Sequence, residues 1–408
     1  MLGWLDATVR EVVSVHSAVP PGRHLPGYAR DLVRMHEAVI GGSRPPLRPR
    51  DVVSRSWSRM LRLGLTADRR NARDSIGEDE VSRRRHDSPL RDVIDELRQV
   101  IGAMPDAAHM LLVVTDADGI ILWRVGTSSV RRRADDLGFA EGADWTEAKV
   151  GTNAIGTALA EAAPVELLAG EHFEQEQHPW YCTASPVHDP RTGDLLGVID
   201  VSGPALTLHP AIGALVEAGR RLAESELWRS HQQRLDRLRQ QAEPLLAGTA
   251  GPALVVDDNG WVAHGSGVAV GDRIAAPQAG QILAVPGLGA CLPEPLVDGW
   301  LVRPSSPGRA LVLDLDLSPT PLLRVRTGDT GWRRPITRRH AEILALLHSA
   351  GPGGLSAEAL SRALFGDAGH LVTVRAEVSR LRRLLGAIVD TQPYRLATGV
   401  QLTVHPGQ

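Results

Sequence analysis

The chain has 408 residues, enough for two to four domains, and its 43% hydrophobic and 23% charged residues are ordinary values for a globular protein. Its formal net charge of −3 excludes a uniformly basic coat for nucleic acid, although it allows a local basic patch. The two cysteines, Cys182 and Cys291, lie far apart and cannot form a disulfide framework or a paired-cysteine metal site, which fits a reducing cytosol.

Two further absences restrict the function. No run approaches the ~18 apolar residues of a membrane helix, and the N-terminus lacks a signal-peptide pattern, so we expect a cytoplasmic protein with no membrane partner. The single lysine, Lys149, is followed by Val150, so it cannot belong to a Gly-Lys-Ser/Thr phosphate-binding loop. A GxSxG motif is also absent. We therefore predict that the chain is not an enzyme.

Residues 1–85 alternate short helical patterns with breaks rich in proline and arginine, which predicts a helical N-terminal segment. The clearest helix begins at Asp51 and carries apolar residues at helical spacing up to Leu63, with Gly64 as its stop signal. A second helix is predicted from Leu90 to Ile101.

Residues 86–208 read as a mixed sheet and helix domain. Two apolar runs, 110–115 and 120–123, flank the turn residues 116–119 and predict a hairpin. A second hairpin is predicted from the runs 184–188 and 195–201, and a helix from about Asn153 to Ala162 lies between the two hairpins. This alternation predicts an α+β sensor domain within an α+β multidomain chain.

Residues 209–247 predict one long linker helix. Its apolar residues fall into two seams, and the thirteen-residue step between them indicates a register shift. Packing against the chain's own domains and a coil between two copies are both open. The first seam contains Ile212, Leu215 and Leu222, and the second contains Leu235, Leu238, Ala242 and Leu245.

Residues 248–320 return to a strand pattern, with apolar runs at 253–256, 261–264, 300–303 and 310–315 and dense glycine and proline between them. We predict a small sheet domain. The segment ALVVDDNGWVAHGSG, which contains the first two runs, resembles the opening strands of a PAS domain. A spacer or dimerisation role is favoured there over a second ligand site.

The last unit, residues 321–408, differs from the rest in charge. Residues 322–408 hold 12 arginines and 6 acidic residues, a formal charge of +6, which leaves −9 for the rest of the chain. This asymmetry is a signal for nucleic-acid binding. Thr337 and Ser356 are predicted to cap two helices, a third helix is expected from Leu371 to Leu385, and a hairpin from Ile388 to Leu396.

The third of these helices is amphipathic. Its apolar face carries Val374, Val378, Leu381 and Leu385, and its polar face carries Arg375, Ser379, Arg382 and Arg383. Arginine can bind guanine edges and phosphates in the major groove. From charge alone, a solvated basic face is an equally good interpretation.

The segment TVRAEVSRLRRLLGAIVDTQPYRL, together with ITRRHAEILALL and LSAEALSRALFG upstream, resembles the OmpR-type winged-helix domain over about 70 residues. Pro393 stands where that family has a glycine before Tyr394, so a different wing turn is expected. The resemblance implies that duplex DNA binds to the third helix and the wing, through Thr373, Arg375, Ser379, Arg380, Arg382, Arg383 and Arg395.

The segments DWTEAKVGTNAIGTALAEAAPVELLAGEHF and CTASPVHDPRTGDLLGVIDVSG, together with VVSRSWSRMLRLGLTADR near the N-terminus, resemble the GAF sensor region of acetoin-catabolism-type activators. The likeness covers about residues 30–225. Those activators usually continue into an ATPase domain, which this chain lacks because it has no phosphate-binding loop. Gly151, Thr152 and Asn153 are expected to turn the chain and cap the next helix, and Gly156 to allow close packing.

GAF domains commonly hold a small ligand, and the resemblance implies a pocket lined by Trp145, His172, Phe173, Trp180 and Cys182. The residues His172, His178, Cys182 and His188 have spacings that fit no standard metal site, so we predict none. Redox sensing by Cys182 requires a lowered thiol pKa, which the sequence cannot show.

These observations together predict a bacterial one-component transcriptional regulator. A ligand in the GAF domain, whose identity the sequence does not give, would change the long helix and the winged helix. A homodimer is expected because winged helices often read paired half-sites. The alternative is a signalling adaptor that acts through protein contacts of its GAF and PAS-like modules and does not bind DNA.

Overall fold

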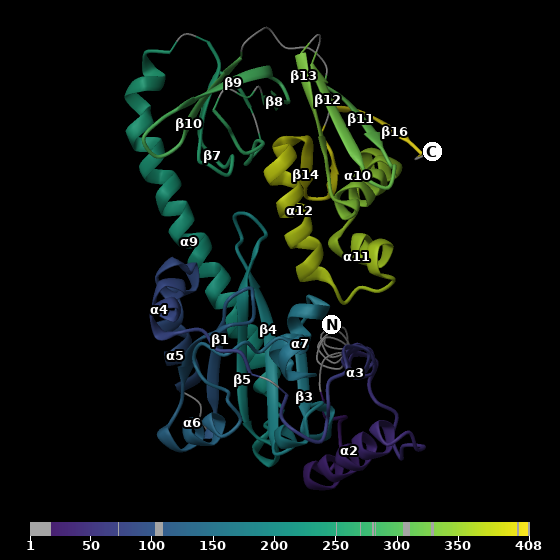
Figure 1. The fold of residues 1–408 in the computed structure, drawn as a ribbon. Helices are drawn as coiled ribbons and strands as arrows, with labels where there is room; N and C mark the ends of the chain where they lie inside the picture. The colour runs from purple at the N-terminus through teal and green to yellow at the C-terminus, as the bar shows by residue number, and fades with distance from the viewer. Residues whose placement is uncertain are drawn as a thin grey trace, which may run out of the picture. The chain divides into compact units, whose positions relative to one another are not determined.

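The computed structural model describes residues 18–71, 73–102, 109–249, 251–269, 271–279, 281, 283–304, 311–327, 330–397 and 400–406 (Figure 1). The chain divides into two compact units, Met1–Asp189 with Leu195–Leu227, and Pro190–Asp194 with Trp228–Gln408. Both units combine helices with sheets, which confirms the mixed α and β multidomain architecture. Among the described residues, no helix is both long and apolar enough to cross a bilayer.

The N-terminal helices of the first unit are part of its main core. They are α2 (Leu25–Ile40), α3 (Asp51–Leu63), α4 (Glu78–Asp87) and α5 (Ile94–Gly102). Helix α3 ends before Gly64, as predicted, and buries Trp57 and Met60. These side chains share one apolar cluster with the sheet described next, so the predicted separation at residue 85 is wrong: the N-terminal helices belong to the same folding unit.

The sheet of the first unit has five antiparallel strands in the order β2-β1-β5-β4-β3. Residue Asp116 shapes the β1–β2 turn, because its Oδ1 accepts the amides of Asp118 and Ile120, both at 3.0 Å. Both hairpins lie where the sequence predicts them. The strands are β1 (Leu111–Thr115), β2 (Ile121–Val125), β3 (Val165–Leu168), β4 (Trp180–His188) and β5 (Leu195–Pro204).

Three helices lie between β2 and β3: α6 (Ser128–Asp135), α7 (Glu147–Val150) and α8 (Ala154–Glu161). Asn153 caps α8, with its Oδ1 accepting the Gly156 amide at 2.9 Å. A Cβ atom on Gly156 would clash with the backbone of Glu147. The predicted structural roles of Asn153 and Gly156 are therefore confirmed.

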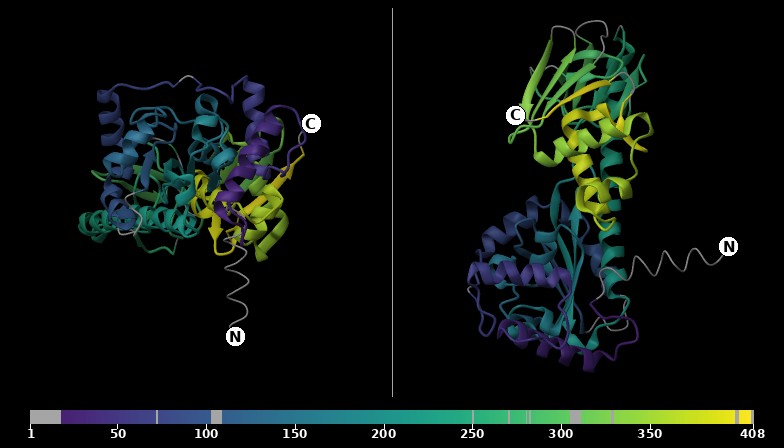
Figure 2. Two further views of the ribbon diagram at one scale, coloured as in Figure 1. Left: turned by 90° about the horizontal axis from the view of Figure 1, so that it is seen from below. Right: turned by 90° about the vertical axis from the view of Figure 1, so that its right-hand side faces the viewer.

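Helix α9 (Ile212–Ala247) runs without a break for 36 residues (Figures 1 and 2). One continuous buried stripe replaces the two predicted seams, because polar side chains complete it: Arg220 is 5% exposed and His231 is 1% exposed. The stripe is buried within the chain, with its first half in the first unit and its second half in the second. It consists of Ile212, Val216, Arg220, Ala223, Leu227, His231, Leu235, Leu238, Ala242 and Leu246.

The second unit begins with another five-stranded antiparallel sheet, in the order β7-β6-β10-β9-β8. Two of its strands, β8 (Leu283–Val285) and β9 (Gly289–Pro295), are missing from the sequence interpretation, because β8 has only three residues and because glycine and proline interrupt the apolar pattern of β9. The other strands are β6 (Ala253–Val256), β7 (Val262–Ser266) and β10 (Trp300–Pro304).

The C-terminal module contains three helices and a second, four-stranded sheet in the order β13-β12-β11-β16. The predicted boundary at 320/321 is too late, because β11 (Leu311–Asp316) pairs with β12 and β16 and its leucines join the C-terminal core. The other strands of this sheet are β12 (Leu322–Thr327), β13 (Thr330–Pro335) and β16 (Val400–His405).

The three C-terminal helices are α10 (Arg338–Ala350), α11 (Ala357–Phe365) and α12 (Leu371–Leu385). The hydroxyls of Thr337 and Ser356 cap the first two, as predicted, by accepting amides at 3.1 and 3.2 Å. A two-stranded hairpin, β14 (Val389–Thr391) and β15 (Tyr394–Leu396), follows α12 at the predicted wing position.

Candidate nucleic-acid interface and ligand site

The apolar face of α12 fixes the orientation of this helix. Val374, Val378, Leu381 and Leu385 are at most 2% exposed and join the core formed by α10, α11 and the four-stranded sheet. Because residues on one helix face cannot also point to the opposite side, the polar face of α12 is directed away from this core.

The predicted DNA-contacting side chains of α12 differ in exposure. Arg375 and Arg383 are exposed, whereas Ser379 and Arg380 are half-buried. Arg380 Nη1 donates to Glu377 Oε1 at 2.5 Å. Thr373, in the first turn, is also half-buried. Arg375 and Arg383 are therefore the most accessible of these five residues.

Arg382 does not lie on an exposed face. It is 5% exposed, its Nε donates to the Val389 carbonyl at 2.9 Å, and its guanidinium forms an ion pair with Asp272. The expectation that Arg382 shares the open basic face is therefore wrong in this conformation. Its aliphatic stem and its bond to Val389 instead hold the end of α12 against the hairpin.

The hairpin presents one charged pair. Arg395 in β15 lies opposite Asp390 in β14, with 3.1 Å between Arg395 Nε and Asp390 Oδ2. Both side chains are about two-fifths exposed, at 40% and 39%. The turn contains a cis peptide bond between Gln392 and Pro393. Arg395 is therefore accessible to a phosphate group, in competition with Asp390.

A segment of the second unit, residues 271–276 and called the strap here, packs against the polar face of α12. Arg273 Nη1 donates to the Ser379 carbonyl at 3.1 Å, and the Ala276 amide donates to the Arg383 carbonyl at 2.8 Å. A Cβ atom on Gly386, just after α12, would clash with the backbone of Ile274. The strap therefore covers part of the face that a major groove would require.

Arg273 is the central residue of the strap. It is fully buried, its Nε donates to the Asn259 carbonyl at 2.9 Å, and its guanidinium lies 4.9 Å from the centre of the Trp261 ring. Burial, with a further contribution from the charge of Arg382, lowers the pKa of Arg273 to about 9. Its Nη2 atom has no hydrogen-bond partner in the described part of the chain. A buried cation with an incomplete set of partners makes this contact costly.

Four of the five side chains predicted to line a sensor pocket are buried, and Cys182 is partly buried. Trp145 packs on Phe139 with 4.5 Å between ring centres, whereas Trp180 lies under Arg133. His172 and Phe173 are fully buried. Cys182 lies in the middle of the sheet, on β4 between β3 and β5.

Cys182 lies beside the most perturbed carboxyl group of the first unit. It pairs with Ser202, whose hydroxyl donates to Asp200 Oδ2 at 2.6 Å. Burial raises the pKa of Asp200 to about 8, and burial together with Asp200 raises the pKa of the Cys182 thiol. These shifts oppose the reactive thiolate that redox sensing by Cys182 would need.

The pKa values of two histidines in this region are lowered, His172 being fully buried and His178 half-buried. Burial is the largest cause that lowers the pKa of His172 to about 4 and that of His178 to about 3. His36 lies edge-on to His178, with 4.6 Å between ring centres. Within the described residues no group of three or more histidine, cysteine or acidic side chains could hold a metal ion.

Three buried glutamates that the sequence interpretation missed attach the N-terminal helices to the sheet domain. Glu147 accepts from Arg59, Ser56 and Thr157 at 2.5 to 2.9 Å. In the same way Glu171 accepts from Arg50, and Glu174 from Arg73. The only sequence signal was the density of arginines before residue 74, because each pair joins positions 88 or more residues apart.

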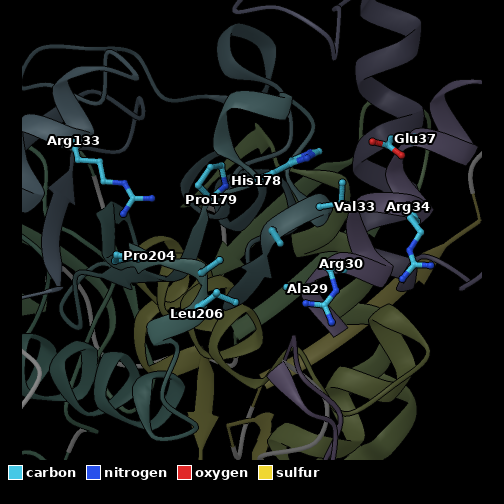
Figure 3. A pocket seen from close by; sticks show the side chains of 12 residues that line it. Ala29, Arg30, Val33, Arg34, Glu37, Arg133, His178, Pro179, Pro204 and Leu206 are labelled. Atoms are coloured by element: carbon cyan, nitrogen blue, oxygen red, sulfur yellow. The ribbon is translucent and has the colours of Figure 1, made fainter. Parts of the chain in front are cut away.

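A cavity of about 660 Å³ opens on the first unit between α2 and the end of β5. Figure 3 shows its apolar floor, which includes Val33, Pro179 and Leu206, with Arg30 and Arg133 at its rim. None of the five predicted pocket residues lines it. The cavity is therefore a candidate ligand site separate from the predicted pocket residues.

Residues 34–224 match the family model described as MimR, N-terminal domain. This range lies in the first unit apart from the loop 190–194, and it includes the sheet and the three glutamates. The match agrees with the resemblance to activator sensor regions inferred from the sequence.

Three curated relatives are similar to this chain. An uncharacterized 47.3 kDa protein in the thcA 5′ region of Rhodococcus erythropolis is 33% identical over 86% of this chain and 63% of its own length. The acetoin dehydrogenase operon transcriptional activator AcoR of Bacillus subtilis is 40% identical over 32% of this chain and 21% of its own. The propane 2-monooxygenase operon transcriptional activator MimR of Mycolicibacterium goodii is 32% identical over 32% and 22%.

The chain thus spans less than two thirds of the length of each of these relatives. The two relatives with assigned functions are named as transcriptional activators, which agrees with the expectation that this chain is not an enzyme.

Proposed function

We propose that the chain is a one-component transcriptional regulator that binds duplex DNA through a C-terminal winged helix of the OmpR type. The observation that carries the proposal is α12, a helix with a buried apolar face and an arginine-bearing opposite face, followed by a hairpin with Arg395. The module has the net positive charge that attraction to phosphates requires.

The first unit would be a GAF-type sensor. Its match to the MimR N-terminal domain and its likeness to AcoR support this role. An effector bound there would act through α9, because this unbroken helix contributes its first half to the first unit and its second half to the second. The sheet β7-β6-β10-β9-β8 would be the PAS-like spacer.

A homodimer is part of the proposal, because winged helices often read paired half-sites. The stripe of α9 is buried within the chain, whereas Leu245 of the second predicted seam is 44% exposed and remains open to a dimer contact. Sedimentation at micromolar concentration should give the mass of a dimer, and a strictly monomeric mass would contradict this part of the proposal.

The central experiment measures DNA binding by the full chain. An operator is first selected from a random duplex library with the purified protein, and affinity is then measured for this operator and for a scrambled duplex. Replacement of the exposed Arg375 by alanine should cost ~1–3 kcal/mol on the operator and relax specificity at one base pair. Arg338→Ala, an exposed arginine on α10, is the matched control and should have little effect.

The alternative, a signalling adaptor with a merely solvated basic face, gives the opposite result. For an adaptor, the library yields no selected sequence, the affinity for any duplex does not depend steeply on salt, and Arg375→Ala and Arg338→Ala have the same affinity for DNA. That outcome, obtained with folded protein, would refute the DNA-binding proposal.

A further inference from the structure

A second cavity, of about 840 Å³, lies within the second unit. The segment after the strap forms one wall, β13 and the start of α10 form another, and α12 forms the third. The side chains that give the cavity its chemistry are Trp332, Arg333, Arg334, Arg380, Arg383 and Gln278.

The cavity has an excess of positive charge. Four arginines line it, whereas Asp258 is the single acidic residue among the lining residues, and its Oδ1 already accepts from Trp300 at 2.8 Å. Arg333 and Arg334 are exposed and form no ion pair in the part of the chain that the structure describes. Arg380 and Arg383 are partly neutralised by Glu377 and Asp194, so the uncompensated charge lies on Arg333 and Arg334. An anion with several charges would relieve the repulsion between these two guanidinium groups.

The remaining lining residues fit a nucleotide-sized molecule. The volume lies within the range of ordinary ligand pockets. The half-buried Trp332 offers a ring surface for stacking, and Gln278 an amide for hydrogen bonds. Arginine recognises phosphate with two parallel hydrogen bonds, which gives both affinity and orientation.

We propose that this cavity binds a small anion that carries two or more phosphate groups. Arg333 and Arg334 would hold the phosphates from β13, and Arg380 and Arg383 would reach them from α12. The site is separate from the sensor unit and would give the chain a second input.

Binding of this anion would also weaken the binding of DNA, an effect that rests on the proposed function. Arg380 and Arg383 belong to the face predicted to contact DNA, so one set of guanidinium groups would serve both ligands. By linkage, a bound anion lowers the affinity for DNA, and bound DNA lowers the affinity for the anion by the same factor.

The test titrates the full chain with tripolyphosphate, ADP and ATP at constant ionic strength, using calorimetry and tryptophan fluorescence. Saturable binding of ATP or of tripolyphosphate is expected, and it should weaken by at least about tenfold in the double variant Arg333→Ala/Arg334→Ala. The matched control is Arg324→Ala, an exposed arginine on the neighbouring strand β12 that does not line the cavity. Both substitutions are at exposed positions, and thermal unfolding checks that each variant is folded.

Three outcomes would overturn the proposal: no saturable binding of any probe at millimolar concentration, equal binding by the double variant, or equal losses in the control. Trp332→Leu distinguishes a nucleotide from an inorganic polyphosphate as the ligand. If a base stacks on Trp332, this variant should bind ADP and ATP more weakly and tripolyphosphate as well as the wild type does.

The DNA assay keeps the two proposals distinguishable. Anion binding that depends on Arg333 and Arg334 in a chain with no DNA affinity supports the cavity and refutes the proposed function. Anion binding that leaves operator affinity unchanged refutes the competition.

Discussion

The two five-stranded sheets of the chain have the same strand order. When the strands of each sheet are numbered along the chain, both sheets read second, first, fifth, fourth, third from edge to edge. They also share a turn. Asp257 Oδ1 accepts the amides of Asn259 and Trp261 at 2.9 and 2.8 Å, as Asp116 does in the first sheet. What differs is the connection after the second strand. In the first unit it carries α6, α7 and α8, whereas in the second it is short and contains the strap.

Because of this difference, the same strand order is used in two ways in the two units. In the first unit the long connection packs on its own sheet, and buried glutamates attach further helices to it. In the second unit the short connection also pairs with its own sheet, since the Ile274 amide donates to the Gly260 carbonyl at 2.8 Å, but through Arg273 it additionally holds α12. The first sheet thus encloses a core, and the second acts as a support for the candidate DNA-binding helix.

Equivalent positions sharpen the comparison. Val113 and Leu254 each lie three residues before the turn aspartate, and their partners on the fifth strands are Asp200 and Val302. A buried carboxyl group in one sheet thus corresponds to a buried valine in the other. Cys182 and Cys291 also occupy equivalent positions on the fourth strands. Asp200 pairs with Ala184, two residues after Cys182, and Val302 pairs with Pro293, two residues after Cys291.

The largest expected effect concerns Asp200. Its pKa is about 8 in the folded chain against 3.8 for an ordinary aspartate, so between these values the folded state holds a proton that the unfolded chain lacks. The free energy of unfolding therefore falls as pH rises from about 4 to about 8, by up to ~1.4 kcal/mol per pH unit, and stops falling above pH 8. Asp200→Asn should abolish this contribution.

The measurement is the difference in unfolding free energy between the wild type and Asp200→Asn, determined by denaturant titration at several pH values. Taking the difference removes the opposite contributions of His172 and His178. Asp236→Asn, at an exposed position on α9, is the control. A difference that does not change between pH 5 and pH 8 would show that Asp200 is not held as a buried neutral acid.

Removal of Glu147 should give the next largest effect. The Glu147→Ala change leaves Ser56, Thr157 and Arg59 without their shared acceptor, and should cost the first unit about 2 kcal/mol. The value is discounted because the Arg59 side chain is 28% exposed and keeps Glu161. Denaturant unfolding, with hydrogen exchange to locate the loss, would measure it.

The comparison variant is Glu176→Ala, which removes an exposed ion pair with Arg70 and should cost less than ~1 kcal/mol. If both variants lose the same stability, the buried glutamates do not attach the helices more firmly than surface pairs do.

A smaller effect is expected from the strap. Arg273→Ala removes the bonds to Ser379 and should raise the affinity of the full chain for its selected operator by about tenfold, because the strap loses one of its attachments to the polar face of α12. Arg303→Ala, an exposed arginine on β10, is the control. An unchanged or reduced operator affinity in a folded Arg273→Ala chain would contradict an inhibitory role of the strap.

The smallest effect is expected at the hairpin. Arg395→Ala should weaken binding to operator and scrambled duplexes equally and flatten the salt dependence by about one unit. Titrations at several salt concentrations would measure this slope. If Arg395→Ala lowers the preference for the operator over the scrambled duplex and leaves the salt dependence unchanged, Arg395 contacts a base.

Local signals were sufficient for many elements. The caps at Thr337 and Ser356, the end of α3 and the turn at Asp116 depend on neighbouring residues, and each lies where the sequence predicts it. Strand β9 was missed because Gly289, Pro293 and Pro295 hide its pattern, which pairing with β10 overrides. Strand β8 has only three residues, and its partner is β9.

The candidate sites were harder to predict because their partners are distant in sequence. Arg382 pairs with Asp272, 110 residues away, and nothing near Arg382 indicates that it is buried. The stripe of α9 was read as two seams because Arg220 and His231 are polar, although both are buried. Amphipathic patterns identify a core face, but they do not show which polar residues a neighbouring segment will cover.

The two equivalent cysteines have a practical consequence for spectroscopy. Burial raises the pKa of both thiols, that of Cys291 to about 12, and Cys291 is buried whereas Cys182 is partly buried. Cys291 is therefore expected to react more slowly than Cys182 with maleimide dyes near neutral pH, and Cys182→Ser would give a background suited to site-directed labelling. A cysteine introduced at the exposed Gln278, two residues after the strap, would carry a fluorophore whose emission could be followed in solution as DNA is added.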